Sequence, residues 1–299
     1  MNTTTRPQPG SGRALVLGGG GSAGNAWLIG VIAGLLEGGL DVTDADLVIG
    51  TSAGATAAAQ IGGASPADLF AAVVSTPIPR PSTRPSGPRP ITWAHLERTN
   101  AIIAASADLA DMRRRVGEDA IELAEASGAA GRERWRETVA SRLPSPHWPE
   151  RAVLLTAVDA DTGEPVELHR DSGVDLVDAV AASCAGGPAY AIGGRRYIDG
   201  GYRRSSENAD LAAGCERVLV LSPLGGRTRH PAAWGSELAV QVQELRAGGS
   251  RVESILPDAD SLEAFGENMM DPSTRPAAAR AGHRQGHGVA GRLAGFWRR

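Results

Sequence analysis

The sequence predicts an α/β fold built on a mostly parallel sheet, with helices packed on its faces. A short, continuous apolar run at 13–17 leads through glycines into an apolar helical segment at 25–37. A second run at 47–50 leads through a tight turn into an Ala-rich segment at 55–61. Runs of this kind are typical of strands buried on both faces. Two successive strand–helix units imply parallel strands, because each helix returns the chain to the same edge of the sheet.

The second unit carries a Gly-x-Ser-x-Gly motif at its strand-to-helix turn, Gly50-Thr51-Ser52-Ala53-Gly54. So tight a turn forces Ser52 into a strained backbone that its flanking glycines tolerate, and it lifts the Ser52 hydroxyl clear of the sheet. Nucleophiles are presented in this way. The pattern alone is weak evidence in a chain rich in Gly, Ala and Ser, so the prediction depends on the strand–turn–helix context.

The remaining chain predicts a continuation of this fold around an insertion. Residues 76–90 contain six prolines and three arginines with almost no apolar residue, which indicates a solvated extended loop. A helical pattern follows at 93–142 and completes an inserted layer over 76–150. The later expected elements are strands at 152–158, 166–169, 217–221 and 251–257, a short strand ending at Asp199, helices at 174–183 and 234–245, and a peripheral helical region from 261.

Composition narrows the class of protein. The 299 residues are 42% hydrophobic and 21% charged, enough to bury a large core. A net charge of −4 makes nucleic acid a poor partner. Cys184 and Cys215 are too few for a disulfide framework and have no metal-ligand spacing, so we expect reduced thiols. Residues 1–12 are expected to form a disordered leader, and without a signal peptide or an apolar run of about 20 residues we expect a cytoplasmic protein.

Serine chemistry needs two further groups, and the sequence offers a candidate for each. A hydroxyl attacks an ester only when a base accepts its proton and donors stabilise the oxyanion. The glycine run 18–21 has bare amides that could converge on a negative oxygen beside Ser52. Asp199, in a sharp turn with Gly200 and Gly201, is the candidate base. A carboxylate is a weak base at its ordinary pKa of about 3.9, so Asp199 would need partial desolvation.

Together these motifs resemble those of the patatin-like phospholipases, a family of serine lipid acyl hydrolases with a Ser–Asp dyad. The family has a glycine-rich loop, a Gly-x-Ser-x-Gly elbow and a later Asp-Gly-Gly turn. The chain has all three in the same order, at 18–24, 50–54 and 199–201. The resemblance covers about 13–286 and implies a three-layer α/β/α fold. Beyond it, the arginines at 292, 298 and 299 indicate a basic C-terminal tail at 287–299.

The resemblance also implies a mechanism. Ser52 would be the nucleophile, Asp199 the general base, and the amides of Gly19, Gly20 and Gly21 the oxyanion hole. No metal or cofactor is implied. The implied partner is a lipid or other ester substrate, with transient contact to a membrane surface, and the oligomeric state is left open. The chain departs from the family at Ala23, where Arg or Lys usually precedes the last glycine of the first motif.

Other interpretations of the same residues make different predictions. Gly19-x-Gly21-x-x-Gly24 also fits a dinucleotide fingerprint, so a non-catalytic nucleotide-binding protein is an alternative. That alternative predicts an acidic residue at the end of the second strand, where this chain runs into Ser52 instead. An acyltransferase could use the same dyad. A Ser-Asp-His triad would require one of three later histidines: His230, His283 or His287.

Overall fold

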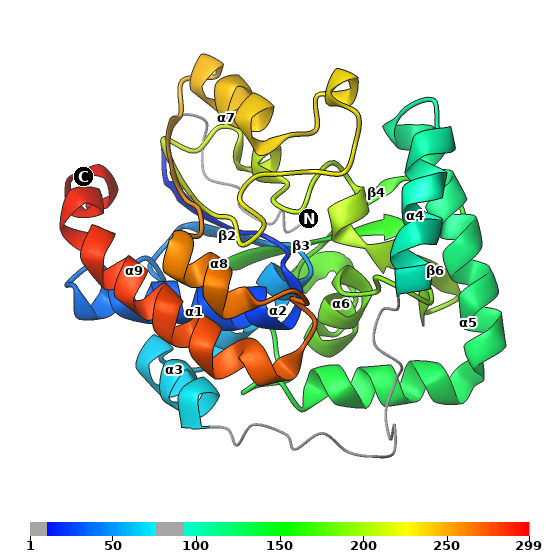
Figure 1. Cartoon of the computed structure of the whole chain (residues 1–299), viewed down its shortest axis with the longest axis horizontal. Coiled ribbons are helices and arrows are strands. Elements are labelled where there is room, and N and C mark those ends of the chain that lie inside the picture. The colour runs from blue at the N-terminus through cyan, green and yellow to red at the C-terminus, as the bar shows by residue number, and fades with distance from the viewer. Residues whose placement is uncertain (1–10, 76–92, 299) are drawn as a thin grey trace.

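The computed structural model describes residues 11–75 and 93–298. Its centre is an eight-stranded sheet in the order β5-β6-β3-β2-β1-β7-β8, with β4 also paired to β3 (Figure 1). The strands are β1 (Arg13–Leu17), β2 (Leu47–Gly50), β3 (Ala152–Asp159), β4 (Pro165–Leu168), β5 (Tyr190–Ile192), β6 (Arg195–Asp199), β7 (Arg217–Leu221) and β8 (Arg251–Ile255).

The sheet is mostly parallel, as predicted. β3, β2, β1, β7 and β8 run parallel to one another, whereas β4 and β6 pair antiparallel with β3, and β5 pairs antiparallel with β6. The antiparallel edge predicted from the return strand is therefore present. Strand β5 was not predicted, because its three residues follow a Gly- and Pro-containing stretch with no alternating pattern.

Helices cover both faces of the sheet, which gives the predicted three layers. In β1, Leu15 and Leu17 contribute to the apolar cluster beneath one helical layer, while Ala14 and Val16 contribute to the cluster on the other face. The helices are α1 (Gly21–Glu37), α2 (Ala53–Gly63), α3 (Pro66–Ser75), α4 (Trp93–Ala105), α5 (Leu109–Ala140), α6 (Leu176–Ser183), α7 (Leu238–Ala247), α8 (Ala259–Phe265) and α9 (Arg275–Trp297).

The predicted helical insert consists of two helices, α4 and α5, at one end of the sheet (Figure 1). Asp108 precedes α5 and caps its N-terminus, because its side chain accepts a hydrogen bond from the Asp111 amide at 2.8 Å. Within α5 the chain turns at Gly128, where φ is 63°. A small apolar cluster that includes Met112 of α5 and Ile198 of β6 joins this layer to the sheet. The predicted loop at 76–90 lies outside the described residues.

The C-terminal region is not peripheral, and this corrects the sequence interpretation. Helix α9 lies along α1 (Figure 1), and its last residue, Trp297, is fully buried. The predicted boundary at residue 286 falls inside α9, so 287–297 belongs to the core and is not a free tail. The two helices approach closely through glycines: a Cβ on Gly34 would collide with the His283 carbonyl, and one on Gly286 with the Val31 carbonyl.

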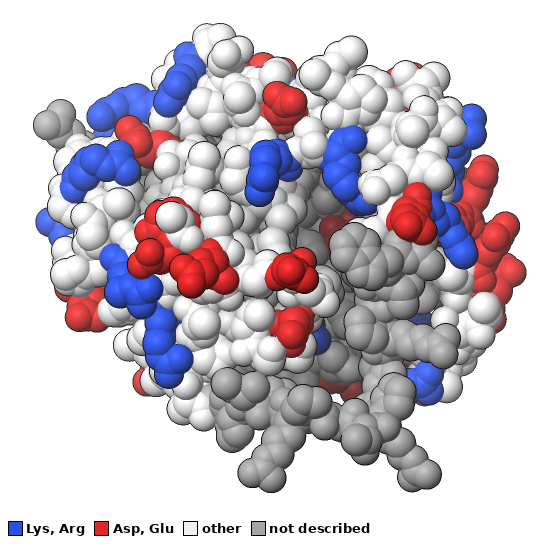
Figure 2. All heavy atoms as spheres, viewed as in Figure 1, with Lys and Arg blue, Asp and Glu red and all other residues white. Residues whose placement is uncertain are grey.

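Two properties of the whole molecule bear on its possible partners. On the face shown in Figure 2, acidic and basic side chains are interspersed and do not gather into one patch of either sign. Within the described ranges, no helix combines the length and the apolar character that crossing a bilayer requires. The predicted leader lies almost wholly outside the described residues.

Candidate active site

Ser52 occupies the turn between β2 and α2, as the motif predicts. Its φ of 53° and ψ of −115° place it in a region that non-glycine residues rarely adopt. The turn leaves no room for side chains on either side. A Cβ on Gly54 would collide with the carbonyl of Leu17, and one on Gly50 would lie 2.7 Å from Ala55 Cα. Both glycines are thus required for the elbow itself.

Asp199 ends β6 and begins a tight turn on the neighbouring part of the sheet. It lies opposite Ala157 of β3, and its Oδ1 accepts a hydrogen bond from the Gly201 amide at 2.7 Å. A Cβ on Gly200 would collide with Thr156 of β3, so only glycine allows this close approach. The sharp turn expected from the Asp-Gly-Gly sequence is present.

The fold brings Ser52 beside the Asp199 carboxyl, close enough for its hydroxyl to act on the pKa of that carboxyl. Burial raises the pKa of Asp199 from 3.8 to about 6, although the hydrogen bonds from the Gly201 amide and the Ser52 hydroxyl act to lower it. A carboxylate with a pKa near 6 is a stronger base than an ordinary one. This is the partial desolvation that the sequence argument requires.

The glycine-rich loop lies beside Ser52, since a Cβ on Gly19 would be 3.5 Å from Ser52 Cβ. The Gly19 amide is nevertheless already engaged: it donates to the Ser206 carbonyl at 2.8 Å. This corrects the expectation that Gly19 supplies an oxyanion donor. Among the described residues, the amides of Gly20, Gly21 and Ser22 have no acceptor.

Ser22 was missed because nothing in the sequence indicates which consecutive amides are free. The first amides of a helix lack intrahelical acceptors, so they can bind an anion. In α1, a segment far along the chain limits how many of these amides stay free. The next amide, that of Ala23, donates to the Met269 carbonyl at 2.9 Å, and this carbonyl belongs to the segment that precedes α9.

The departure at Ala23 also has a structural explanation. The Ala23 side chain is fully buried, so a long basic side chain would not fit there in this packing. A cation from another element lies next to the same turn. Arg275, at the start of α9, donates to the Ser22 carbonyl and to Asn25 Oδ1, each at 3.0 Å.

A buried polar layer joins the two turns from below. Asn208 donates through Nδ2 to the Gly200 carbonyl at 2.9 Å and to Thr51 Oγ1 at 3.1 Å. Thr51 Oγ1 and Thr156 Oγ1 are 2.9 Å apart. Asn208 therefore links the residue before Ser52 to the residue after Asp199. Its place in the sequence, on the way from the Asp199 turn to β7, gave no signal of this contact.

The three histidines considered for a triad have other contacts. His230 Nδ1 is 3.0 Å from Ser236 Oγ and its ring packs on Trp234, while burial and the nearby Arg229 lower its pKa to about 4. His283 pairs with Glu37 at 2.7 Å, and His287 is exposed. No contact of these three with the Ser52–Asp199 pair is found in the described part of the chain.

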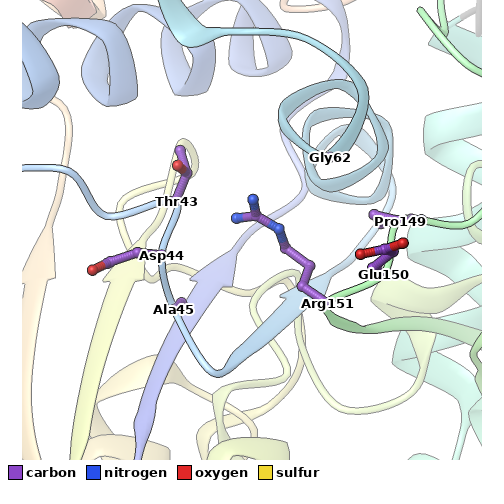
Figure 3. A pocket seen from close by; sticks show the side chains of 7 residues that line it. All are labelled: Thr43, Asp44, Ala45, Gly62, Pro149, Glu150 and Arg151. Atoms are coloured by element: carbon purple, nitrogen blue, oxygen red, sulfur yellow. The ribbon is translucent and has the colours of Figure 1, made fainter.

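A hollow of about 460 Å³ lies at the end of the sheet where the parallel strands begin, opposite the end that carries Ser52 (Figure 3). Its lining includes Ala45 and Arg151, which precede β2 and β3, whereas Ser52 follows β2. The Arg151 side chain points into the space between Thr43 and Gly62 (Figure 3). This hollow is separate from the Ser52 elbow.

A serine on a strand-to-helix elbow, beside free helix-start amides, is the arrangement of α/β ester hydrolases. The family comparison gives the particular class. The model of the patatin-like phospholipases matches residues 15–213, more than half of the chain. The chain therefore belongs to the patatin-like phospholipase family and is, at the level of that family, a lipid acyl hydrolase.

Solved structures similar to this chain include two bacterial proteins, one from Legionella pneumophila and one from Pseudomonas aeruginosa. VipD from Legionella pneumophila has a TM-score of 0.43 and 13% sequence identity, over 96% of this chain and 67% of VipD. The type III effector ExoU has a TM-score of 0.41 and 15% identity, over 95% of this chain. The matched region is 53% of ExoU, so this chain spans about half the length of that protein. No curated protein sequence matches the chain.

Proposed function

We propose that this chain hydrolyses carboxylic ester bonds of lipids through an acyl-enzyme on Ser52, with Asp199 as general base. Asp199 accepts the hydroxyl proton as Ser52 Oγ attacks the acyl carbonyl, and it gives this proton to the departing alcohol or lysolipid. A water that Asp199 deprotonates then releases the fatty acid and returns Ser52 to its starting state. The observation that carries the proposal is that the fold places Ser52 and Asp199 next to one another, with their amides bound to neighbouring residues, Ser183 and Ala185, and that burial raises the pKa of the Asp199 carboxyl to about 6.

The oxyanion of each tetrahedral intermediate would be bound by the amides of Gly20, Gly21 and Ser22. Support comes from their position at the first turn of α1 and from the absence of competing acceptors among the described residues. Losing one such donor typically costs about 10²–10³ in rate, so the glycine loop matters as much as the nucleophile. No metal or cofactor is required for these steps.

The proposed substrates are lipid esters, with soluble short-chain esters as practical assay substrates. Aromatic residues are only 4% of the chain, which gives no strong interfacial belt of the kind that Trp and Tyr form at membrane surfaces. Transient contact with a membrane surface and a location in the cytoplasm are parts of this proposal.

The test is a fluorophosphonate, which labels activated serines covalently. We expect one adduct, on Ser52, and no labelling of Ser52→Ala. Ester hydrolysis should disappear in Ser52→Ala and fall about 10²–10⁴-fold in Asp199→Asn, the usual contribution of a general base. Undiminished hydrolysis by Asp199→Asn, or a collapse in His230→Ala, would contradict the dyad.

A further inference from the structure

We propose that residues 183–185, where α6 ends, form a clamp that positions both members of the dyad. Ser183 and Cys184 hold the backbone of Ser52, and Ala185 holds the backbone of Asp199. The inference rests on the proposed function, because it concerns how the same two side chains are kept in register.

The first part of the argument is the strained backbone of Ser52. A residue stays in so sparsely populated a conformation only when its surroundings fix it from several sides. The Ser52 amide donates to Ser183 Oγ at 3.0 Å, and Cys184 Sγ donates to the Ser52 carbonyl at 3.1 Å. Consecutive side chains of one segment thus bind the amide and the carbonyl of the nucleophile.

The second part is the backbone of the candidate base. The Asp199 amide donates to the Ala185 carbonyl at 2.9 Å. Ser52 and Asp199 come from different strands, and β3 lies between β2 and β6 in the sheet. A three-residue segment that binds both backbones therefore fixes the separation between Ser52 Oγ and the carboxyl directly, without relying on strand spacing alone.

The segment itself is firmly held. Ser183 is fully buried, and so are the alanines 179, 181 and 182 of α6. Trp135 of α5 donates through Nε1 to the Ala181 carbonyl at 3.1 Å, which ties this turn of α6 to the helical layer. A clamp must be more rigid than the group it positions, and these contacts provide that rigidity.

Cys184 is suited to donate and not to react. Burial, followed by the nearby charge of Asp199, raises the pKa of its thiol to about 12. The thiol therefore stays protonated in any ordinary assay, keeps its proton for the Ser52 carbonyl, and does not compete with Ser52 as a nucleophile.

The experiment compares kcat, KM and the rate of fluorophosphonate labelling in two pairs of variants. Ser183→Ala removes the acceptor and Ser183→Thr keeps it; Cys184→Ala removes the donor and Cys184→Ser keeps it. We expect kcat and the labelling rate to fall about 10²-fold in Ser183→Ala, with KM near that of the wild type, because a small misplacement of a reacting group costs about this much. The fall in Cys184→Ala should be smaller, and Ser183→Thr and Cys184→Ser should recover most of the rate.

Ser250→Ala is the matched control. Ser250 is also a buried serine, and its hydroxyl donates to the Cys215 carbonyl at 2.7 Å. Both residues lie where strands β7 and β8 begin, at the opposite end of the parallel strands from Ser52. Ser250→Ala should lower the melting temperature and leave kcat unchanged. If both alanine variants fold and label Ser52 at the wild-type rate, the clamp is refuted and the dyad stands. If Ser250→Ala instead loses kcat along with melting temperature, and the Ser183 and Cys184 variants lose kcat in the same proportion, the effect is general destabilisation and the clamp is again refuted. A wild-type protein that does not label on Ser52 overturns the proposed function first.

Discussion

Asp199 is the residue whose environment the fold alters most usefully. The carboxyl lies at the end of a strand, where burial removes most of its hydration and raises its pKa. Among the described residues, the Gly201 amide and the Ser52 hydroxyl act in the opposite direction and lower that pKa. The same burial that makes it a better base also makes its charged form costly to the folded protein. Activity and stability should therefore respond to pH in opposite directions.

The rate of ester hydrolysis should report the protonation of this base. Asp199 must be ionised to accept the Ser52 proton, so kcat/KM should rise with pH and reach half its plateau near pH 6, the pKa to which burial raises the carboxyl. The measurement is a pH–rate profile with a soluble short-chain ester. A profile that is flat between pH 5 and pH 8 would contradict the assignment.

Thermal stability should show the reverse dependence. The folded pKa of about 6 exceeds the ordinary carboxyl value of 3.8, so the native state binds the proton more tightly, and the stability due to this group is lost as pH rises from about 4 to about 6. Asp199→Asn should therefore raise the free energy of unfolding at pH 7.5 by about 1–2 kcal/mol, allowing for the partial solvent exposure of this side chain, and change it little at pH 4. The melting temperature should rise at pH 7.5 accordingly. A variant that is less stable than the wild type at pH 7.5 would argue against a desolvated carboxylate.

At this scale the sequence predicted the turns that carry Ser52 and Asp199 better than the hydrogen bonds around them. Ser52 and Asp199 lie in motifs whose glycines indicate tight turns, and a turn is predictable because it depends on residues that are neighbours in the sequence. Whether the Gly19 amide is free depends instead on the Ser206 carbonyl, far along the chain. The same is true of Ser183 and Asn208, whose side chains act on backbone groups of distant elements. No local pattern encodes such contacts.

Among the elements, the pairing of α1 with α9 decides much of the packing on one face of the sheet. Their glycines allow backbone to approach backbone, and the buried residues of α9 are mainly alanine and glycine. Small residues give little hydropathy signal, so α9 showed no amphipathic stripe and was predicted to be peripheral. Strands β1, β2 and β7 were predictable for the opposite reason, since their continuous apolar runs are a strong signal.

Two glycine substitutions in α9 test this contact. A Cβ at Gly286 would meet the Val31 carbonyl, which cannot move without shifting α1. Gly286→Ala should lower the free energy of unfolding by about 1–3 kcal/mol, the usual cost of overpacking. Gly288→Ala, two residues on, meets nothing within 4 Å and should raise it by about 0.5–1 kcal/mol through helix propensity. Urea unfolding measures both, and similar effects of the two changes would show that the helices are not in close contact.

For the molecule as a whole, residues 287–297 pack onto the core through one buried face. Leu293 and Trp297 are almost fully buried, and Trp297 Nε1 donates to Asp44 Oδ1 at 3.1 Å. Complete burial of side chains of this size contributes about 1.5–3 kcal/mol each, against a total stability of about 5–15 kcal/mol. A chain ending at Gly286 should therefore aggregate or melt at a much lower temperature, whereas one ending at Arg298 should match the full chain. Calorimetry of both proteins decides whether 287–297 is a dispensable tail.

The contact between the Ala23 amide and the Met269 carbonyl has a consequence for how the molecule is made. Helix α1 leaves the ribosome well before the segment that completes its first turn. Until then the nascent chain carries an apolar helix without its partner. The first turn of α1 is accordingly complete only once the segment that carries Met269 has been synthesised and has folded against it.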